Sequence, residues 1–304
     1  MTMISVDHLT KDYGHGRGVF DVSIQVKEGE CYGFLGPNGS GKTTTIRHLM
    51  GFSKPGQGTT MVSGMDSWKN SAALKNIVGY LPGEVTLPAG MSGTAFLRMM
   101  DRMRRVKKTG YLNMLLERFE LDPAISIKQM SLGVKRKLAV VTAFMHDPGI
   151  LILDEPTSGL DPVMQETFID FVKEEKSRGK TIFLSSHIFH EVDACCDRIG
   201  IIRDGKIVSE FQSGELKQRH DRIYLITFAD QISYDQFTRR PFRFTSKNPG
   251  KFSARLQIEV DQVGELAACL GEFDIADFVE IPFTLEDYFM SFYDTGHHFE
   301  EVRA

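Results

Sequence analysis

The segment GPNGSGKT, residues 36–43, has the residue types and spacing of a loop that binds phosphate groups. It fits the pattern GxxxxGK[ST], in which glycines leave room for phosphate oxygens beside the backbone N–H groups. A strand-like stretch precedes the loop and a helix pattern follows it, so a helix N-terminus would also face the negative charge. Lys42 would reach the β- and γ-phosphates, and the Thr43 hydroxyl would bind Mg²⁺. The nucleotide-contacting residues predicted here are Gly36, Pro37, Asn38, Gly39, Ser40, Gly41, Lys42, Thr43 and Thr44.

Two adjacent carboxylates close a second apolar run, ILILDEP, which has the composition of a buried strand. Asp154, at the end of this strand, would hold the coordination shell of Mg²⁺, as such residues do in P-loop NTPases. Glu155 is placed to polarise an attacking water molecule. Taken alone, the pair fits equally well as a cap of the turn at Pro156. Beside the phosphate loop, the catalytic interpretation is favoured.

Buried strands and helices must position these residues, and the sequence contains both. CYGFL precedes the phosphate loop, and ILILD and TIFLSSH are further apolar runs of strand length, with amphipathic helix patterns between them. Residues 86–146 are mostly helical by their three-to-four spacing of apolar residues. After Gly214, shorter alternating strands such as RIYLITFA replace the buried runs. We therefore predict an α/β fold with a first domain at 1–215, a helical subdomain at 86–146 within it, and a small α+β extension at 216–304.

The composition limits the setting and the partners. The 304 residues carry 36 basic and 40 acidic side chains, so no global charge excess favours nucleic acid as a partner. The four cysteines form no CxxC pair, which indicates a reduced cytoplasmic setting. The N-terminus lacks a signal sequence, and no apolar run approaches the ~20 residues that span a bilayer. If the protein acts at a membrane, another chain must span it.

Further motifs resemble those of the nucleotide-binding subunit of an ABC transporter, a P-loop NTPase. The carboxylates continue into DEPTSGLD, which resembles the D-loop of this family, with Asp161 at its key position. SSH ends at His187, which matches the switch histidine that contacts the γ-phosphate, and Tyr13 in LTKDYG matches the aromatic residue that stacks on adenine. The resemblance covers residues 1–215 and implies ATP and Mg²⁺ as cofactors. The catalytic residues that it implies are Lys42, Glu155 and His187.

The segment QMSLGVKRKLAV falls on the signature turn of the family, usually LSGGQ. By resemblance, this turn contacts ATP held by a partner subunit, because two such chains pack head-to-tail. Ser131 would cap the following helix and offer its hydroxyl, and Gly133 would let the backbone approach the γ-phosphate. From these residues alone, a plain N-capped helix is an equal alternative. Lys135, Arg136 and Lys137 are predicted to form a largely solvated face.

Two places depart from the family pattern. Leu132 replaces the first signature glycine and Val134 the glutamine; leucine at positive φ would cost about 1–2 kcal/mol, so an ordinary backbone is expected there. In GYLPGEV, Gly83 stands where the family has a glutamine that touches Mg²⁺ and relays to the membrane subunit. Glu84, the next residue, is a candidate substitute ligand for Mg²⁺, and a solvated loop acid is an equal alternative.

The resemblance implies an ATP-hydrolysing subunit that closes as a homodimer or heterodimer and drives a separate transmembrane permease from the cytoplasmic face of the cell membrane. Packing on its own small sheet is the favoured explanation of the closing segment TLEDYFMSFY, which also resembles the extension found in drug and antibiotic exporters. The apolar face of this segment comprises Leu285, Tyr288, Phe289 and Phe292. The alternatives are a soluble ABC ATPase acting on ribosomes, DNA or cofactor assembly, and a scaffold without turnover. The transported substrate is not encoded in these motifs.

Overall fold

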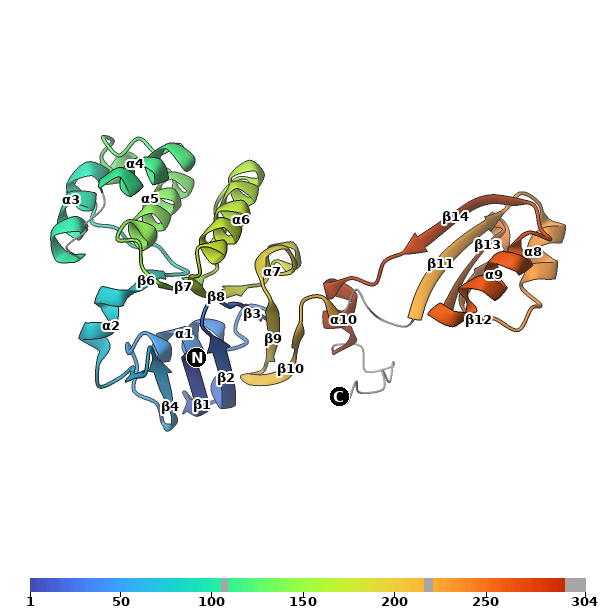
Figure 1. The fold of residues 1–304 in the computed structure, drawn as a ribbon, viewed down its shortest axis with the longest axis horizontal. Coiled ribbons are helices and arrows are strands. Elements are labelled where there is room, and N and C mark those ends of the chain that lie inside the picture. Colours follow the sequence, from blue (N-terminus) through green and yellow to red (C-terminus); the bar gives the residue numbers. More distant parts are fainter. Residues whose placement is uncertain (105–108, 216–220, 293–304) are drawn as a thin grey trace. The chain divides into compact units, whose positions relative to one another are not determined.

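The structure is a computed structural model that describes residues 1–104, 109–215 and 221–292 (Figure 1). It separates into two compact units, Met1–Ser213 and Gly214–Ala304. Each unit has a hydrophobic core of its own. The larger unit contains the phosphate loop and both carboxylates.

A six-stranded sheet runs through the larger unit and confirms the predicted α/β class. Its order is β10-β9-β3-β8-β7-β6, with β10 antiparallel and the other five strands parallel. The strands are β3 (Cys31–Leu35), β6 (Val78–Leu81), β7 (Ile150–Asp154), β8 (Thr181–Ser186), β9 (Arg198–Arg203) and β10 (Lys206–Gln212). Every residue of β3, β7 and β8 is buried, which explains their continuous apolar sequences. The segments that follow these three neighbouring parallel strands therefore emerge at one edge of the sheet.

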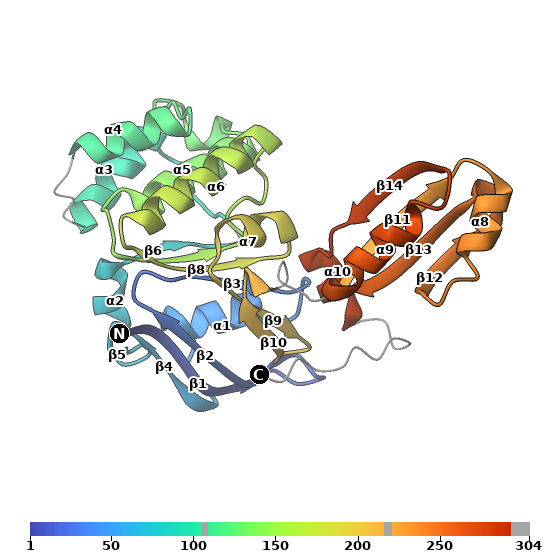
Figure 2. The same cartoon turned by 45° about the vertical axis from the view of Figure 1, so that its right-hand side comes forward.

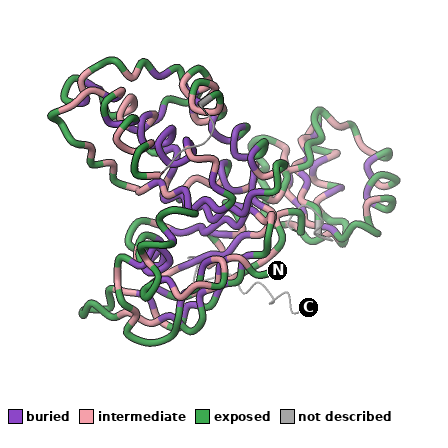
Figure 3. The backbone as a smooth tube through the Cα atoms, turned by 60° about the vertical axis from the view of Figure 1, so that its left-hand side comes forward, coloured by how far each residue is buried: buried purple, intermediate pink, exposed green. Residues whose placement is uncertain are grey.

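An antiparallel sheet, ordered β2-β1-β4-β5, completes the core beneath the phosphate loop. Its strands are β1 (Thr2–Asp12), β2 (Gly18–Lys27), β4 (Gln57–Val62) and β5 (Met65–Asp66), and the helix packed on it is α1 (Lys42–Leu49). Ile46 and Leu49 of α1 are buried in one cluster with Ile4 and Val22 of this sheet and Phe34 of β3. Figure 3 shows this concentration of buried residues in the larger unit. The helix that begins at the phosphate loop is thus fixed from both sheets, each such side chain contributing about 1.5–3 kcal/mol of burial.

Helices form a separate layer beside the six-stranded sheet (Figure 2). They are α3 (Gly93–Arg104), α4 (Thr109–Arg118) and α5 (Leu132–Phe144), with the 3₁₀ turn η1 (Ile127–Gln129) before α5. The remaining helices of this unit are α2 (Ser71–Ile77), α6 (Pro162–Ser177) and α7 (Phe189–Cys195). The ring of Phe144, at the end of α5, lies 4.9 Å from the ring of Phe171 in α6, centroid to centroid. This aromatic contact anchors the helix that carries the signature turn to the helix that follows the D-loop.

The smaller unit is an α+β structure with the sheet order β12-β13-β11-β14. Its elements are β11 (Asp221–Phe228), α8 (Gln231–Phe237), β12 (Arg243–Asn248), η3 (Pro249–Lys251), β13 (Ser253–Glu259), η4 (Val260–Gln262), α9 (Val263–Leu270), β14 (Ile275–Ile281) and α10 (Leu285–Ser291). Phe228, Phe237 and Leu266 form part of its core. In α10, Leu285 and Phe289 are buried. No helix within the described ranges is both long and apolar enough to cross a bilayer.

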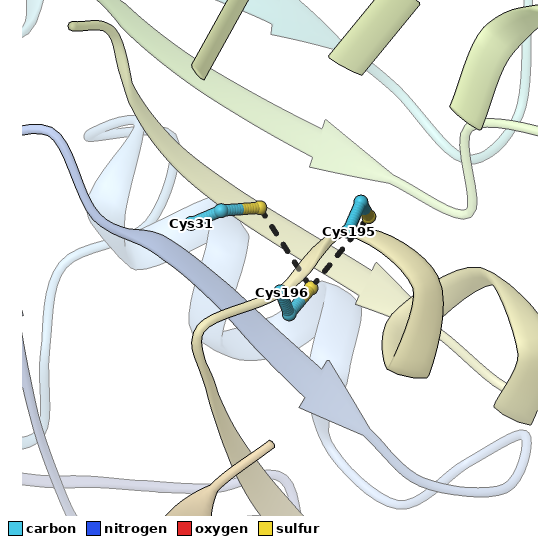
Figure 4. A group of neighbouring side chains, drawn as sticks. All are labelled: Cys31, Cys195 and Cys196. Atoms are coloured by element: carbon cyan, nitrogen blue, oxygen red, sulfur yellow. Dashed lines mark hydrogen bonds between the residues drawn. The ribbon is translucent and has the colours of Figure 1, made fainter. Parts of the chain in front are cut away.

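Three free cysteines meet between β3 and the end of α7 (Figure 4). The Sγ atom of Cys196 lies 3.7 Å from that of Cys31 and 3.9 Å from that of Cys195. These are the separations of touching sulfur atoms, and all three side chains are buried. They pack as small apolar groups with weak S–H donors.

Candidate functional site

The phosphate loop between β3 and α1 has a backbone that only glycine tolerates at several positions. Gly39 and Gly41 have φ angles of +84° and +113°, in the region that L side chains rarely adopt. A Cβ atom at Gly36 would lie 2.5 Å from the carbonyl oxygen of Ile202. The buried hydroxyl of Ser40 has no hydrogen-bond partner among the described residues. A cradle that excludes side chains, ends at a helix N-terminus and keeps an unpaired donor fits a triphosphate.

Lys42, the first residue of α1, has a buried side chain that turns back over this loop. Its Nζ donates to the carbonyl oxygens of Gly36, at 2.5 Å, and Pro37, at 3.2 Å. The same atom lies 3.0 Å from Oε1 of Glu155. Two loop carbonyls and one carboxylate therefore hold the ammonium over the loop, within reach of an anion bound there.

Thr43 and Asp154 meet at the end of β7 and offer oxygen ligands of the kind that Mg²⁺ prefers. The hydroxyl of Thr43 donates to Oδ2 of Asp154 at 2.8 Å, and the hydroxyl of Ser185 donates to Oδ1 at 2.5 Å. Asp154 is fully buried, so these two hydroxyls fix its orientation. The pair fits a divalent cation beside the phosphate loop.

Gly83, rather than Glu84, is the residue closest to this pair in the segment after β6. A Cβ atom at Gly83 would lie 3.1 Å from Oδ2 of Asp154, whereas Glu84 is exposed in a bend one residue later. The position at which the family has a glutamine is thus next to Asp154, but the residue here is Gly83, which has no side chain. Coordination of Mg²⁺ by Glu84 stays a prediction.

Glu155 has a left-handed backbone, with φ of +48°, which costs a non-glycine residue about 1–2 kcal/mol. Its N–H donates to the carbonyl oxygen of Ser185 at 3.0 Å, which ties it to β8. Its carboxylate reaches Lys42 through Oε1 and lies 2.5 Å from Nδ1 of His187 through Oε2. The fold therefore brings the three predicted catalytic residues, from three separate segments, into direct contact.

Arg136 corrects the prediction of a solvated basic face. Its side chain is 2% exposed and lies between α5 and the loop after β7. Its Nε donates to the carbonyl of Pro156 at 3.0 Å, and its Nη atoms donate to the carbonyls of Pro82, Gly83, Asp154 and Glu155. Burial lowers the pKa of Arg136 to about 10, opposed mainly by the charge of Asp154, so the guanidinium stays protonated at neutral pH.

A signal for this burial was available in the sequence. Arg136 precedes the buried residues Ala139 and Val140 by three and four positions, which places it on the same face of α5. Lys135 and Lys137, its neighbours, are only partly buried. Three consecutive basic residues on a helix point in three directions, so one of them can face inward.

The signature turn caps α5 as predicted from its serine. The Oγ atom of Ser131 accepts a hydrogen bond from the N–H of Val134 at 3.3 Å, and Ser131 itself is exposed. Leu132 is 71% exposed and keeps an ordinary helical backbone, so this leucine is unstrained, as expected. A Cβ atom at Gly133 would lie 3.1 Å from the carbonyl oxygen of Gly159, so the turn adjoins the D-loop.

Two further predicted residues lie on loops of the same unit. Asp161 is the N-cap of α6, where its Oδ1 accepts from the N–H of Met164 at 3.0 Å. Tyr13, in the connection between β1 and β2, is 54% exposed, so its ring is accessible to a stacking partner. Their roles with ATP, like those of the other site residues, stay predictions.

The buried carboxyl group of Glu191, close to His187 in the chain, makes the stability of the fold depend on pH. Its buried Oε2 accepts from the hydroxyl of Ser186 at 2.5 Å, and that hydroxyl accepts from the N–H of Ile188 at 2.9 Å. Burial raises the pKa of Glu191 from 4.5 to about 8. Because the folded pKa lies above the unfolded one, its stabilisation is complete below the unfolded pKa and disappears as pH rises through about 8.

We therefore expect the free energy of unfolding to fall by a few kcal/mol as pH rises from 4.5 to about 8, and to change no further through this group above that. Glu191→Gln should flatten this part of the profile, because glutamine does not titrate. Urea unfolding of both proteins across this range measures it. Parallel profiles would mean that Glu191 is already ionised in the folded chain.

The fold and the phosphate loop together define a P-loop nucleotide-binding ATPase. The pattern that defines the ABC transporter family matches residues 19–158. The bacitracin transport ATP-binding protein BcrA of Bacillus licheniformis is 36% identical over 236 residues, which cover 76% of each chain. The Nod factor export ATP-binding protein I of Paraburkholderia xenovorans is 34% identical over 212 residues, 68% of this chain and 70% of that protein. This chain therefore belongs to the family of ABC transporter ATP-binding proteins.

A solved structure supports the same assignment. The ATP-binding subunit of an ABC transporter superposes with a TM-score of 0.66 at 27% identity, covering 71% of this chain and 92% of that one. As a member of this family, the chain is an ABC-type ATPase that binds ATP. The predicted family, fold class and enzyme class are confirmed.

Proposed function

We propose that this chain is the ATP-hydrolysing subunit of an exporter and drives a separate permease by ATP-dependent closure of a dimer. The convergence of Lys42, Glu155 and His187 beside the phosphate loop is the observation that carries the proposal. The named relatives, one for bacitracin transport and one for Nod factor export, support a drug, antibiotic, peptide or lipid-like substrate. The permease would hold this peripheral subunit at the cytoplasmic face of the cell membrane.

The residues divide the chemistry among them. When bound, ATP supplies the phosphoryl group and Mg²⁺ offsets its negative charge. Thr43 and Asp154 would hold the metal, and Lys42 would neutralise phosphate oxygens. Glu155 would accept the proton of the attacking water, while His187 orients its carboxylate and contacts the γ-phosphate. Ser131 and Gly133 would act on the ATP of the partner subunit, in a homodimer or a heterodimer.

We place the permease contact on α3, where a shallow groove combines apolar and basic side chains. The groove is lined by Ala95, Arg98, Met99, Arg102 and Met103. Met103 is 65% exposed, so its apolar side chain is accessible to a partner segment. An exposed methionine beside two arginines suits a permease segment with apolar and acidic residues.

This placement gives a test with a matched control. Met103→Glu should weaken binding to membranes that contain the permease of a neighbouring gene by roughly 30-fold, the loss of about 2 kcal/mol typical of an interface hot spot. Ile232→Glu, a change of an apolar residue of similar exposure (70%) in the smaller unit, should leave binding intact. Co-sedimentation with membranes from cells with and without the permease measures both. Equal binding to bare lipid would contradict attachment through a permease, and salt-resistant sedimentation with ribosomes would favour the soluble, non-transport class of ABC ATPase instead.

A further inference from the structure

The Arg136 guanidinium binds two segments of the site that are far apart in the sequence. Its partners are two carbonyls after β6, Pro82 and Gly83, and three carbonyls after or at the end of β7. We infer that Arg136 is the positioning residue of Glu155, and that it joins the signature helix α5 to the loop that carries this base. The inference rests on the proposed function, because it assigns Arg136 a part in the hydrolysis that Glu155 performs.

The hydrogen bonds use the whole donor capacity of arginine. A guanidinium has five N–H donors, and the five carbonyl bonds take one from Nε and two from each Nη atom. A lysine ammonium has three donors, and a glutamine amide has two. No carboxylate within the described residues forms an ion pair with Arg136, so its role is the placement of backbone carbonyls. Among protein side chains, only arginine has enough donors to bind all five carbonyl oxygens at once.

The carbonyls that Arg136 holds are those around Glu155. The groups of Asp154, Glu155 and Pro156 follow one another, and the middle residue has the left-handed backbone. Ser185 fixes the N–H side of Glu155 and Arg136 fixes the carbonyl side. With both ends of this residue fixed, the carboxylate is directed to Lys42 and His187.

The other two carbonyls extend the contact to the segment next to Asp154. Arg136 donates to Pro82 at 2.6 Å and to Gly83 at 3.1 Å. A side chain at the position of Gly83 would point toward the carboxylate of Asp154. A displacement of α5, which begins at the signature turn, would therefore move the backbone of Glu155 and the segment beside the metal ligand together. If a partner's nucleotide docks on Ser131 and displaces α5, the displacement would be transmitted through Arg136 to Glu155 of the same chain.

Steady-state hydrolysis with a matched set of variants tests the inference. Arg136→Lys keeps the charge but loses two donors, so kcat should fall about 10²-fold with KM for ATP nearly unchanged, the size expected for a displaced catalytic group. Lys137→Gln removes a charge from the next position of the same helix and should behave as wild type. Arg136→Gly should lose more turnover than Arg136→Lys and regain part of it with added guanidinium ion, at concentrations that leave the chain folded. Binding of a fluorescent ATP analogue to each variant confirms that the site is folded.

The outcomes separate this inference from the proposed function. If Glu155→Gln keeps wild-type turnover in the same assay, the proposed function fails and Arg136 has no base to position. If Glu155→Gln is inactive but Arg136→Lys retains wild-type kcat, this inference alone is overturned. A rise in KM with unchanged kcat for Arg136→Lys would also overturn this inference. So would an Arg136→Gly variant that binds the analogue but regains no turnover with added guanidinium ion.

Discussion

Glu155→Gln should lose turnover while it retains ATP binding. A positioned general base contributes about 10²–10⁴ in rate, and the amide has the same shape as the carboxylate but cannot accept the proton of water. Lys42 also donates to the carbonyl oxygens of Gly36 and Pro37, so glutamine in place of Glu155 would leave the lysine over the phosphate loop. Single-turnover hydrolysis compares the rates directly, and titration with a fluorescent ATP analogue shows that binding persists.

A surface pair of the same composition provides the control. Glu166 and His190 lie 2.9 Å apart, and both side chains are mostly exposed. Glu166→Gln therefore breaks a glutamate–histidine contact that does not involve the phosphate loop. This variant should hydrolyse ATP at the wild-type rate. A loss under about fivefold for Glu155→Gln, well below the range for a general base, would show that another group activates the water.

Ser131→Arg should abolish ATP-dependent pairing and barely change ATP binding to the monomer. Ser131 is exposed at the start of α5, and a bulky cation there would occupy the place of the partner's γ-phosphate. In the Glu155→Gln background, light scattering should detect a stable ATP-bound dimer for a chain that pairs with itself. Ser131→Arg should remove that dimer. Ser131→Ala loses the helix cap, at about 1 kcal/mol, and the hydroxyl offered to the partner's ATP, but it introduces no cation and should weaken the dimer less.

Mixing two defective chains makes the test decisive. Lys42→Ala loses the ammonium over the phosphate loop, and Ser131→Arg loses the signature turn. A mixed dimer combines the intact loop of one chain with the intact signature of the other, so one complete site forms. Partial recovery of ATP-dependent pairing would establish the arrangement in trans. If Ser131→Arg instead destroys nucleotide binding in the isolated monomer, the turn belongs to the site of its own chain.

The family, the fold class and the order of the motifs could be predicted from the sequence alone. Glycines at 36, 39 and 41 and the buried runs before Gly36 and at Asp154 reflect local requirements of backbone and burial, which short segments encode directly. The expected relaxed backbone at Leu132 followed in the same way from the cost of positive φ. The cap at Ser131 is likewise a local feature.

Contacts between distant segments were decided only by the tertiary structure. Glu155 meets Lys42 and His187 because three parallel strands end at one edge, a relation that no spacing along the chain contains. The three basic residues that follow Val134 look alike in sequence, yet Arg136 alone is buried, because carbonyls from two remote loops surround its place on α5. Burying a charged group is favourable only where such partners converge, and their convergence depends on the packing of the whole unit.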